Sequence, residues 1–354
     1  MKTNSIAGAL AAGGLIAAFL GFGYGTADGG PYGEDSSGVA AEDRLSVGRR
    51  ATDAPVADSS RPLEIAWTPL LPRDDPFLRR QWALEQIGVP VVGVTGGGAN
   101  VVIAILDTGI DRDHEDLAGT IAGEINLTDS PTARDLNGHG THVAGIIAAG
   151  TGNGIGVAGI APKARLLNVK VADDYGLCHP ATVARGIIWA VDNGAMVINI
   201  SLEFRGPAAV LEDAVDYAWT RGVLVIAAAG NDAGDTPVYP AYYPNVIAVS
   251  ATGRADELAP LSNHGDWVDF AAPGLSIYST LPGSRYGYET GTSFAAACVS
   301  GLAALAFSAV SDLNGDGRLN DEVRAAIEGS ARKIEAPGTG HGLIDASALF
   351  AAIP

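Results

Sequence analysis

Short aliphatic runs separated by segments of helical spacing constrain the fold of this chain more than any other feature. Five runs have the length and composition of buried strands: residues 101–106, 164–171, 196–200, 223–229 and 246–249. Three segments between them have helical spacing: residues 141–149, 181–193 and 208–221. Unbroken aliphatic strands that alternate with helices indicate a parallel sheet covered on both faces. We therefore expect an α/β fold, a three-layer sandwich with a central, mostly parallel, doubly wound sheet flanked by helices.

Charge and cysteine content exclude several classes of function. The 354 residues carry a formal net charge of −18, which argues against nucleic-acid binding because phosphates attract basic surfaces. An acidic surface favours solubility. Two cysteines, Cys178 and Cys298, cannot form a disulfide framework and lack the spacing of a metal site.

The N-terminus has the pattern of a secretory signal peptide. Lys2 precedes a mostly apolar stretch, residues 6–22, and no acidic residue occurs before Asp28. Residues 25–27 offer a small-x-small cleavage site, so we expect residues 1–27 to be the signal peptide of a secreted protein, extracellular or periplasmic. An uncleaved membrane anchor is the alternative, which the short apolar core weakens.

Two further segments follow the expected signal peptide. Residues 28–72 are rich in small and polar residues and lack a sustained period, which is typical of a short pro-segment or disordered leader. Regular patterning starts near Asp75, and a chain of 354 residues could hold one large domain or two.

A serine stands at the start of a long alanine-rich run. Ser293 is followed by small, apolar residues to about Phe307, a pattern typical of a buried helix. A serine in the first turn lies at the positive end of the helix dipole, beside amide groups that favour developing negative charge. Ser293 is therefore a candidate nucleophile. The alternative is that Ser293 only caps the helix.

Three other side chains follow strands or precede helices in the same way. Asp107 directly follows an aliphatic strand, and Asn231 follows another. His139 lies between two glycines at the start of a helical segment. In parallel sheets, binding and catalytic residues usually lie at the carboxyl ends of the strands. With Ser293, these residues supply the acid, imidazole, amide and hydroxyl that acyl transfer needs.

The motifs resemble those of the subtilisin-like serine proteases. The matching stretches are Asp107-Thr108-Gly109-Ile110, Asn137-Gly138-His139-Gly140-Thr141-His142-Val143-Ala144-Gly145, Ala227-Ala228-Ala229-Gly230-Asn231 and Gly291-Thr292-Ser293-Phe294-Ala295. The similarity extends from about Asp75 to about Ala348, and the order Asp, His, Ser is that of the family. The resemblance implies that residues 73–354 form a subtilisin-like peptidase domain.

The resemblance also implies a role for each candidate. Ser293 would be the nucleophile, His139 the general base and then acid, Asp107 the orienting carboxylate, and Asn231 the side-chain donor of the oxyanion hole beside the Ser293 amide. His142 lies one helical turn after His139, and we expect it to be a packing histidine.

A substrate groove is implied by the same resemblance. Residues 199–202 resemble the strand that pairs with an extended peptide, a form of β-augmentation, so protein or peptide substrates are expected. We expect the enzyme to be a monomer. The expected substrate-binding residues are Ser201, Leu202, Glu203, Ala228, Ala229 and Gly230. Glu203 and Phe204 stand where the family usually has glycines, and a carboxylate at Glu203 could favour a basic or polar side chain before the cleaved bond.

A glycine-rich loop, residues 150–159, is a candidate calcium site. The loop follows a helix and precedes a strand, so it lacks the context of a dinucleotide-binding loop and no organic cofactor is expected. Oxygen ligands suit Ca²⁺, and the resemblance implies a structural calcium here. The implied ligands are Asn153, the carbonyls of Thr151, Ile155 and Val157, and the carboxylates of Asp75 and Asp116. The alternative is a tight loop without metal.

Residues 312–318 form a second candidate calcium site. Asp312, Asn314 and Asp316 place oxygens at alternate positions, with glycine at the sixth position of the loop. The twelfth position is Val323 instead of a carboxylate, and Glu322 falls one residue short. A solvated turn before a helix is the alternative.

Two rival functions remain open at the level of sequence. Asp107-Thr108-Gly109 is also the signature of aspartic proteases, but the chain has no second Asp-Thr/Ser-Gly and only a homodimer could supply it. A non-catalytic, peptide-binding relative would be marked by a missing triad member, and none is missing. We therefore expect a secreted, calcium-stabilised serine endopeptidase.

Overall fold

The predicted parallel sheet is confirmed in a computed structural model, which describes residues 74–89 and 97–353. Within these residues, seven strands form one sheet in the order β2-β3-β1-β4-β5-β6-β7, and every neighbouring pair is parallel. The strands are β1 (Val102–Asp107), β2 (Ile121–Asn126), β3 (Arg165–Lys170), β4 (Val197–Ile200), β5 (Leu224–Ala228), β6 (Val246–Thr252) and β7 (Phe270–Pro273). The chain crosses β1 to reach β4, so the layer is doubly wound.

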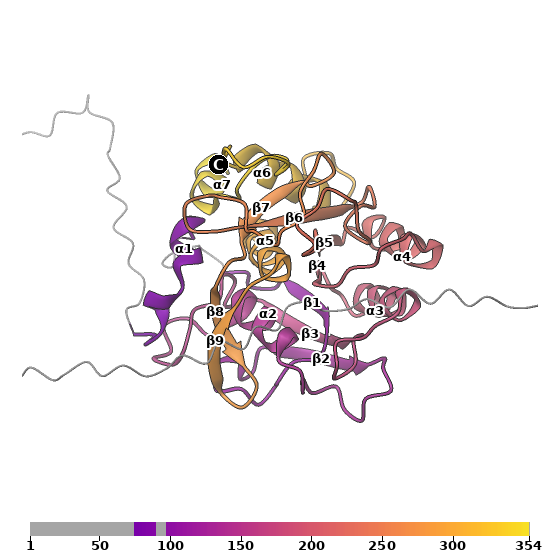
Figure 1. Ribbon diagram of the computed structural model, residues 1–354, viewed down its shortest axis with the longest axis vertical. Helices are drawn as coiled ribbons and strands as arrows, with labels where there is room; N and C mark the ends of the chain where they lie inside the picture. The colour runs from indigo at the N-terminus through magenta and orange to yellow at the C-terminus, as the bar shows by residue number, and fades with distance from the viewer. Residues whose placement is uncertain (1–73, 90–96, 354) are drawn as a thin grey trace, which may run out of the picture. The chain divides into compact units, whose positions relative to one another are not determined.

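Helices cover both faces of this sheet, as the unbroken aliphatic strands predict. Along β1, Ile103 and Ile105 join a core with α2 (His139–Ala148) and α5 (Thr292–Phe307), whereas Ala104 and Leu106 join a core with α3 (Pro180–Asp192) and α4 (Ala209–Trp219). Figure 1 shows the two pairs of helices on opposite sides of the strands. Because successive strand residues point to opposite faces, both faces must be apolar.

The helix α5 lies at the centre of the packing. All sixteen of its residues are buried, and it packs against β4, β5, β6 and β7 as well as α2. Small residues allow this close approach: a Cβ added to Gly301 would lie 2.7 Å from Cβ of Ile160. The helix therefore holds its N-terminal turn rigidly with respect to the sheet.

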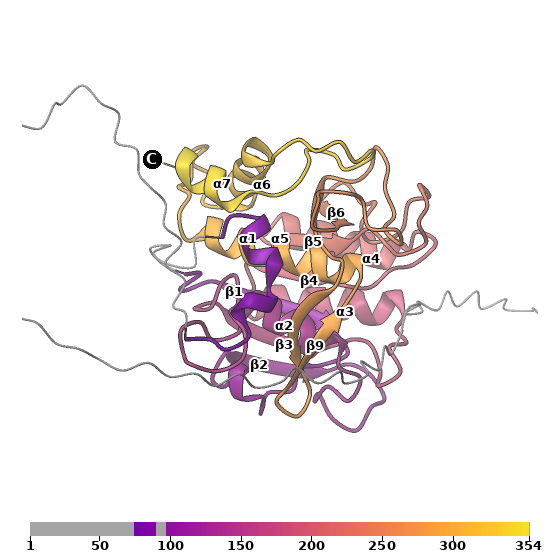
Figure 2. The same ribbon diagram turned by 60° about the vertical axis from the view of Figure 1, so that its left-hand side comes forward.

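An antiparallel hairpin that the sequence did not predict leads into α5. It consists of β8 (Ile277–Leu281) and β9 (Arg285–Glu289). The hydroxyls of Ser279 and Thr280 donate to the carbonyls of His142 and Thr141, at 2.9 and 2.7 Å, so β8 is fastened to α2. Figure 2 shows the hairpin in front of α2. The hairpin thus links α2 to the start of α5.

Five further elements complete the described part of the fold. They are η1 (Leu78–Arg80), α1 (Trp82–Gln86), η2 (Glu115–Leu117), α6 (Asn320–Ser330) and α7 (Ala346–Ala352). The amide of Ala346 donates to the carbonyl of Ile87 at 2.8 Å, which joins the segments before β1 and after α6. The expected signal peptide and pro-segment, residues 1–72, lie outside the described residues. Among the described residues, no helix is long and apolar enough to cross a membrane.

Candidate active site

The acid and the imidazole predicted from sequence are in direct contact. Asp107, the last residue of β1, is fully buried, and its Oδ1 lies 2.8 Å from Nδ1 of His139. The amide of Thr108 also donates to Oδ1, at 2.7 Å. His139 is the first residue of α2, preceded by Gly138 in the left-handed region at φ 115°. A strand end and a helix start therefore bring the two side chains together.

Gly140 explains why α2 can approach β1 so closely. A Cβ at this position would lie 2.2 Å from the carbonyl oxygen of Gly109 and 3.1 Å from Cβ of Asp107. Any side chain here would push the helix away from the strand. The glycine after His139 is therefore a requirement of the geometry, because only a residue without a Cβ allows this close approach.

Asp135 is a buried carboxylate that sequence reasoning missed. Its oxygens accept hydrogen bonds from the amides of Asn137, Gly138 and Thr141, at 2.8–3.0 Å, and from the Thr141 hydroxyl at 2.6 Å. It also accepts from the Thr108 hydroxyl at 3.0 Å. Asp135 thus binds two amides just before α2 and the amide of Thr141 in its first turn, and ties them to the turn after Asp107. The signal available in the sequence was an acid shortly before the helix start.

The electrostatic surroundings favour a protonated His139 more than water does. Burial by itself acts to lower the pKa of His139, but the charge of Asp107 and the hydrogen bond to it outweigh burial, so the pKa is raised. The charges of Glu289, at the end of β9, and of Asp135 act in the same direction. The site therefore stabilises an imidazolium, the form that His139 would take after accepting a proton.

Ser293 lies in the first turn of α5, as the alanine-rich run predicts. The N-cap of α5 is Gly291 and no side chain caps this end, so the interpretation of Ser293 as a capping residue is wrong. The Ser293 hydroxyl lies 3.5 Å from the carbonyl oxygen of Ser201. The ring of Phe294, the next residue, packs against the His139 ring with centroids 5.4 Å apart. The serine and the imidazole are therefore brought to the same edge of the sheet.

Asn231 reaches this edge from the loop after β5. Its Oδ1 accepts hydrogen bonds from the amide and the hydroxyl of Thr292, at 2.9 and 3.1 Å. With the oxygen held in this way, the amide nitrogen of the side chain is the group available as a donor. Asn231 is thus anchored to the residue before Ser293.

His142 is placed as expected for a packing histidine. It is fully buried, its Nε2 lies 3.3 Å from the carbonyl oxygen of Gly287, and its ring packs on Phe294 with centroids 4.6 Å apart. Burial lowers the pKa of His142 to about 3. The side chain therefore stays neutral and braces α2 against β9 and α5.

The expected substrate-binding residues surround the same edge. Ser201 and Leu202 follow β4 and are buried, and the Ser201 hydroxyl donates to the Ser293 carbonyl at 3.1 Å. Ala228 ends β5, and Ala229 and Gly230 follow it in buried positions. Asn263, which sequence reasoning missed, donates from Nδ2 to the Ala229 carbonyl at 2.9 Å and so holds this loop.

Glu203 lies directly against Gly230. A Cβ added to Gly230, which has φ 99°, would lie 2.3 Å from Oε2 of Glu203. The carboxylate also accepts a hydrogen bond from the backbone of Asn231. Burial first, and then the charge of Asp232, raise the pKa of Glu203, while the nearby Arg205 lowers it. A carboxylate is therefore positioned beside two of the expected site residues.

The glycine-rich loop contacts two buried carboxylates. Asp75 and Asp116 are 3% and 2% exposed. Asp75 accepts from the amides of residues 152–154 at 2.8–3.2 Å. Asp116 accepts from Nδ2 of Asn153 at 2.9 Å and from the amide of Val157 at 2.8 Å. Burial, and less strongly the charge of Asp75, raise the pKa of Asp116.

This donor set fits a hard cation. Two buried like charges beside a loop rich in carbonyl oxygens match the oxygen ligands that Ca²⁺ prefers. Among the described residues, no three His, Cys, Asp or Glu side chains are grouped to hold a metal. Carbonyl oxygens such as those of Thr151, Ile155 and Val157 would therefore have to complete a shell around Asp75 and Asp116.

The second candidate loop is satisfied largely by its own chain. Asp312 accepts from the amides of Gly315 and Gly317 at 2.7 and 2.9 Å. Asn314 accepts from the amide of Asp316 at 2.8 Å, and Asp316 forms an ion pair with Arg318. The guanidinium already balances the charge of Asp316, so this loop needs a cation less than the loop around Asp116 does.

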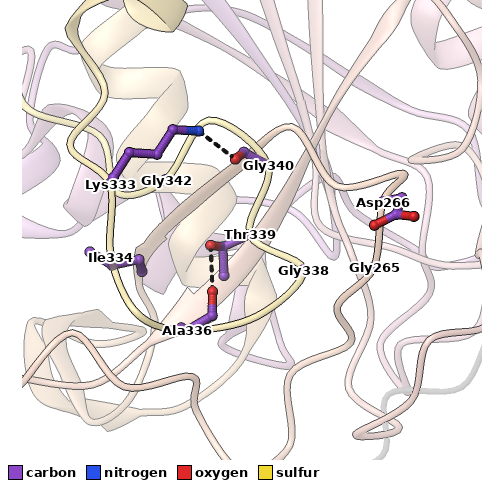
Figure 3. A pocket seen from close by; sticks show the side chains of 9 residues that line it. All are labelled: Gly265, Asp266, Lys333, Ile334, Ala336, Gly338, Thr339, Gly340 and Gly342. Carbon is purple, nitrogen blue, oxygen red and sulfur yellow. Dashed lines mark hydrogen bonds between the residues drawn. The ribbon is translucent and has the colours of Figure 1, made fainter.

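One open cavity lies apart from these residues. It has a volume of about 330 Å³ and is lined by residues 265–266 and by the C-terminal loop 333–342, as Figure 3 shows. Nζ of Lys333 donates across it to the carbonyl of Gly340 at 3.1 Å. None of the candidate catalytic residues lines this cavity.

The fold and the site together define a class, the serine proteases of α/β architecture. Residues 98–343 match the subtilase family. The chain is 48% identical over 247 residues to the thermophilic serine proteinase of Bacillus sp. (strain AK1), a match that covers 70% of this chain and 60% of that protein. It is 45% identical over 269 residues to thermitase of Thermoactinomyces vulgaris. This match covers 76% of this chain and 94% of thermitase.

A solved structure agrees with the sequence relatives. A protease from Pseudoalteromonas arctica PAMC 21717 superimposes with a TM-score of 0.72 at 33% identity, over 79% of this chain and 98% of that one. The chain belongs to the subtilase family of serine proteases. The resemblance inferred from the motifs is therefore confirmed.

Proposed function

We propose that this protein is a secreted serine endopeptidase that cleaves peptide bonds through an acyl-enzyme. The observation that carries the proposal is the 2.8 Å contact of Asp107 with Nδ1 of His139, at the same sheet edge as Ser293. All the proposed catalytic groups come from one chain, so the proposed mechanism needs no residue from a second subunit.

The geometry supports a division of labour among these residues. The bond from Nδ1 to Asp107 fixes the tautomer of His139 and leaves Nε2 as the base. Ser293 Oγ would attack the substrate carbonyl carbon while its proton passes to Nε2 of His139. The same proton would then pass to the leaving amine, and water would repeat the sequence to release the acid product.

Negative charge on the substrate oxygen would be met by two donors. The side-chain amide of Asn231, anchored through its oxygen to Thr292, is one, and the backbone amide of Ser293 at the N-terminus of α5 is the other. Both donors are fixed before the reaction, so little reorganisation is needed as the charge develops.

Protein or peptide substrates would bind in extended form beside residues 199–202. β4 pairs with β1 and β5 only as far as Ile200, so the chain at Ser201 and Leu202 continues beyond the sheet toward Ser293. An extended peptide could add to the main chain at these two residues, as in β-augmentation.

Labelling with a serine-directed sulfonyl fluoride tests the proposal. We expect one label on Ser293 and loss of peptide hydrolysis in proportion to labelling. Activity that survives complete labelling would contradict the serine mechanism and favour the aspartic alternative. A folded wild-type protein that binds peptides without cleaving them would favour the non-catalytic relative.

Secretion and removal of the N-terminal segments are part of the proposal. The pattern of residues 1–27 supports export, and residues 28–72 would be removed afterwards. N-terminal sequencing of the active enzyme should find a start near residue 73. An active enzyme that still begins at residue 28 would contradict the removal of a pro-segment.

We also propose a structural Ca²⁺ bound by Asp75, Asp116, Asn153 and the loop carbonyls of Thr151, Ile155 and Val157. The ion would offset two buried carboxylates and fasten the segment before α1 to the loop after α2. A second ion at Asp312, Asn314 and Asp316 is a weaker proposal, because Arg318 already pairs with Asp316.

A further inference from the structure

A strand-like segment after Leu202 places Glu203 and Arg205 on one side and Phe204 on the other. Phe204 is buried and forms two backbone hydrogen bonds with Tyr239, at 2.7 and 2.9 Å. Because side chains alternate along extended backbone, Glu203 and Arg205 both point away from this anchor. They meet the loop from Gly230 to Asp232.

The cluster of Glu203, Arg205 and Asp232 contains two carboxylates and one cation. Arg205 lies 3.0 Å from Oδ2 and 3.1 Å from Oδ1 of Asp232, so its guanidinium is engaged there. The Glu203 carboxylate accepts a hydrogen bond from the backbone of Asn231. Among the described residues, no cationic side chain forms an ion pair with Glu203 within 4.0 Å. Two carboxylates against one guanidinium leave one negative charge in excess, and that charge is centred on half-buried Glu203.

The excess charge lies where a substrate side chain would be. Glu203 Oε2 sits over Gly230, and its hydrogen bond goes to Asn231, whose side chain is proposed to bind the oxygen of the attacked carbonyl. The side chain nearest that carbonyl belongs to the residue before the cleaved bond. Ser201, two residues before Glu203, has its carbonyl 3.5 Å from Ser293 Oγ. The carboxylate and the nucleophile are thus parts of one site.

We propose that Glu203 makes this enzyme favour lysine or arginine immediately before the cleaved bond. The inference rests on the proposed endopeptidase function. A basic side chain would supply the missing positive charge and reach the carboxylate with its flexible stem. A neutral side chain would cover the carboxylate without pairing it, which costs desolvation energy. An acidic side chain would add a third negative charge to the cluster.

A panel of chromogenic peptides that differ only in the residue before the cleaved bond tests the proposal. The residues compared are Lys, Arg, Phe, Leu and Glu, and the readout is kcat/KM. For the wild type, Glu should be the poorest substrate. The variant Glu203→Gln, which keeps the shape but removes the charge, should lower the Lys-to-Phe ratio of kcat/KM tenfold or more. A ratio within twofold of the wild-type value would overturn the proposal.

Two other variants make the result decisive. Glu335→Gln removes one charge from an exposed carboxylate outside the site and should leave the ratio unchanged. Arg205→Gln removes the guanidinium and should raise the Lys-to-Phe ratio at least threefold. If Glu203→Gln does not fold, judged by circular dichroism, Arg205→Gln decides, and an unchanged ratio there overturns the proposal.

The failure of this inference differs from the failure of the proposed function. If the enzyme hydrolyses all the peptides and Glu203→Gln leaves the Lys-to-Phe ratio of kcat/KM unchanged, only the proposed role of Glu203 is contradicted. A wild-type protein that cleaves none of the peptides and takes no sulfonyl fluoride label removes the peptidase itself.

Discussion

The carboxylate of Asp135 accepts a 3.0 Å hydrogen bond from the hydroxyl of Thr108, the residue after Asp107, the proposed orienting carboxylate. The same carboxylate binds the amides that open α2, where His139 lies. One buried side chain therefore fixes the distance between the strand that carries Asp107 and the helix that carries His139.

Replacing Asp135 should weaken both catalysis and stability. In Asp135→Ala, buried amides of Gly138 and Thr141 lose their acceptor, so we expect a loss of about 3 kcal/mol in the free energy of unfolding. A displaced His139 should lower kcat by roughly 100-fold, with a smaller change in KM. Urea denaturation and steady-state kinetics on one peptide measure the two effects. An unchanged kcat in a destabilised variant would limit Asp135 to a structural role.

The glycine after His139 should not tolerate even one methyl group. In Gly140→Ala the new Cβ would lie 2.2 Å from the Gly109 carbonyl, so overpacking should cost about 2 kcal/mol or more. Gly329→Ala in α6 is the matched control, because a Cβ there meets no atom within 4 Å. That variant should gain about 0.5–1 kcal/mol from its helical position. Thermal melts compare the two, and equal melting temperatures would contradict the close contact of α2 and β1.

The acid limb of the pH profile should depend on Glu289. His139 must be neutral to act as a base, so kcat/KM should rise with pH through the His139 pKa. That pKa is raised, and the charge of Glu289 is one cause. Glu289→Gln should therefore move the acid limb to lower pH, while Glu335→Gln should leave it in place. A limb that stays fixed in Glu289→Gln would show that the charge does not reach the imidazole.

Calcium should raise the melting temperature through the loop at Asp116. If Ca²⁺ is present at about 100 times its dissociation constant, binding stabilises the folded state by about 2.7 kcal/mol. A chelator should remove this gain in the wild type, and Asp116→Asn should abolish the gain without chelator. Asp312→Asn should retain most of the gain, because Arg318 already balances the charge of Asp316 in the loop at residues 312–318. The reverse result would move the main site to that loop.

The sequence predicted the buried strands and the catalytic candidates because both leave local signals. The aliphatic runs of β1, β3, β4, β5 and β6 and the helices α2 to α5 were predicted. β2 was missed because it contains glycine, glutamate and asparagine and is only partly buried. The β8-β9 hairpin was missed because it is held by hydrogen bonds to α2, which is far away in the sequence and leaves no local signal.

The residues that surround the candidate catalytic side chains could not be predicted from the sequence. Asp135 stands in a polar loop, and nothing local shows that its carboxylate is buried against Thr108. The departure at Glu203 was visible in the chain, but its position over Gly230 depends on the bonds between Phe204 and Tyr239, which are distant in the sequence. Such relationships come from tertiary packing.

The backbone bond between Ile87 and Ala346 has a practical consequence for handling this protein. It joins the first and last described segments of the domain. The Ser347 hydroxyl donates a second hydrogen bond, to the Gly88 carbonyl, at 2.8 Å. Shortening the chain from its C-terminal end past Ala346 would therefore loosen α1 at the other end. A purification tag or fusion partner is better placed after Pro354, so that these two hydrogen bonds stay intact.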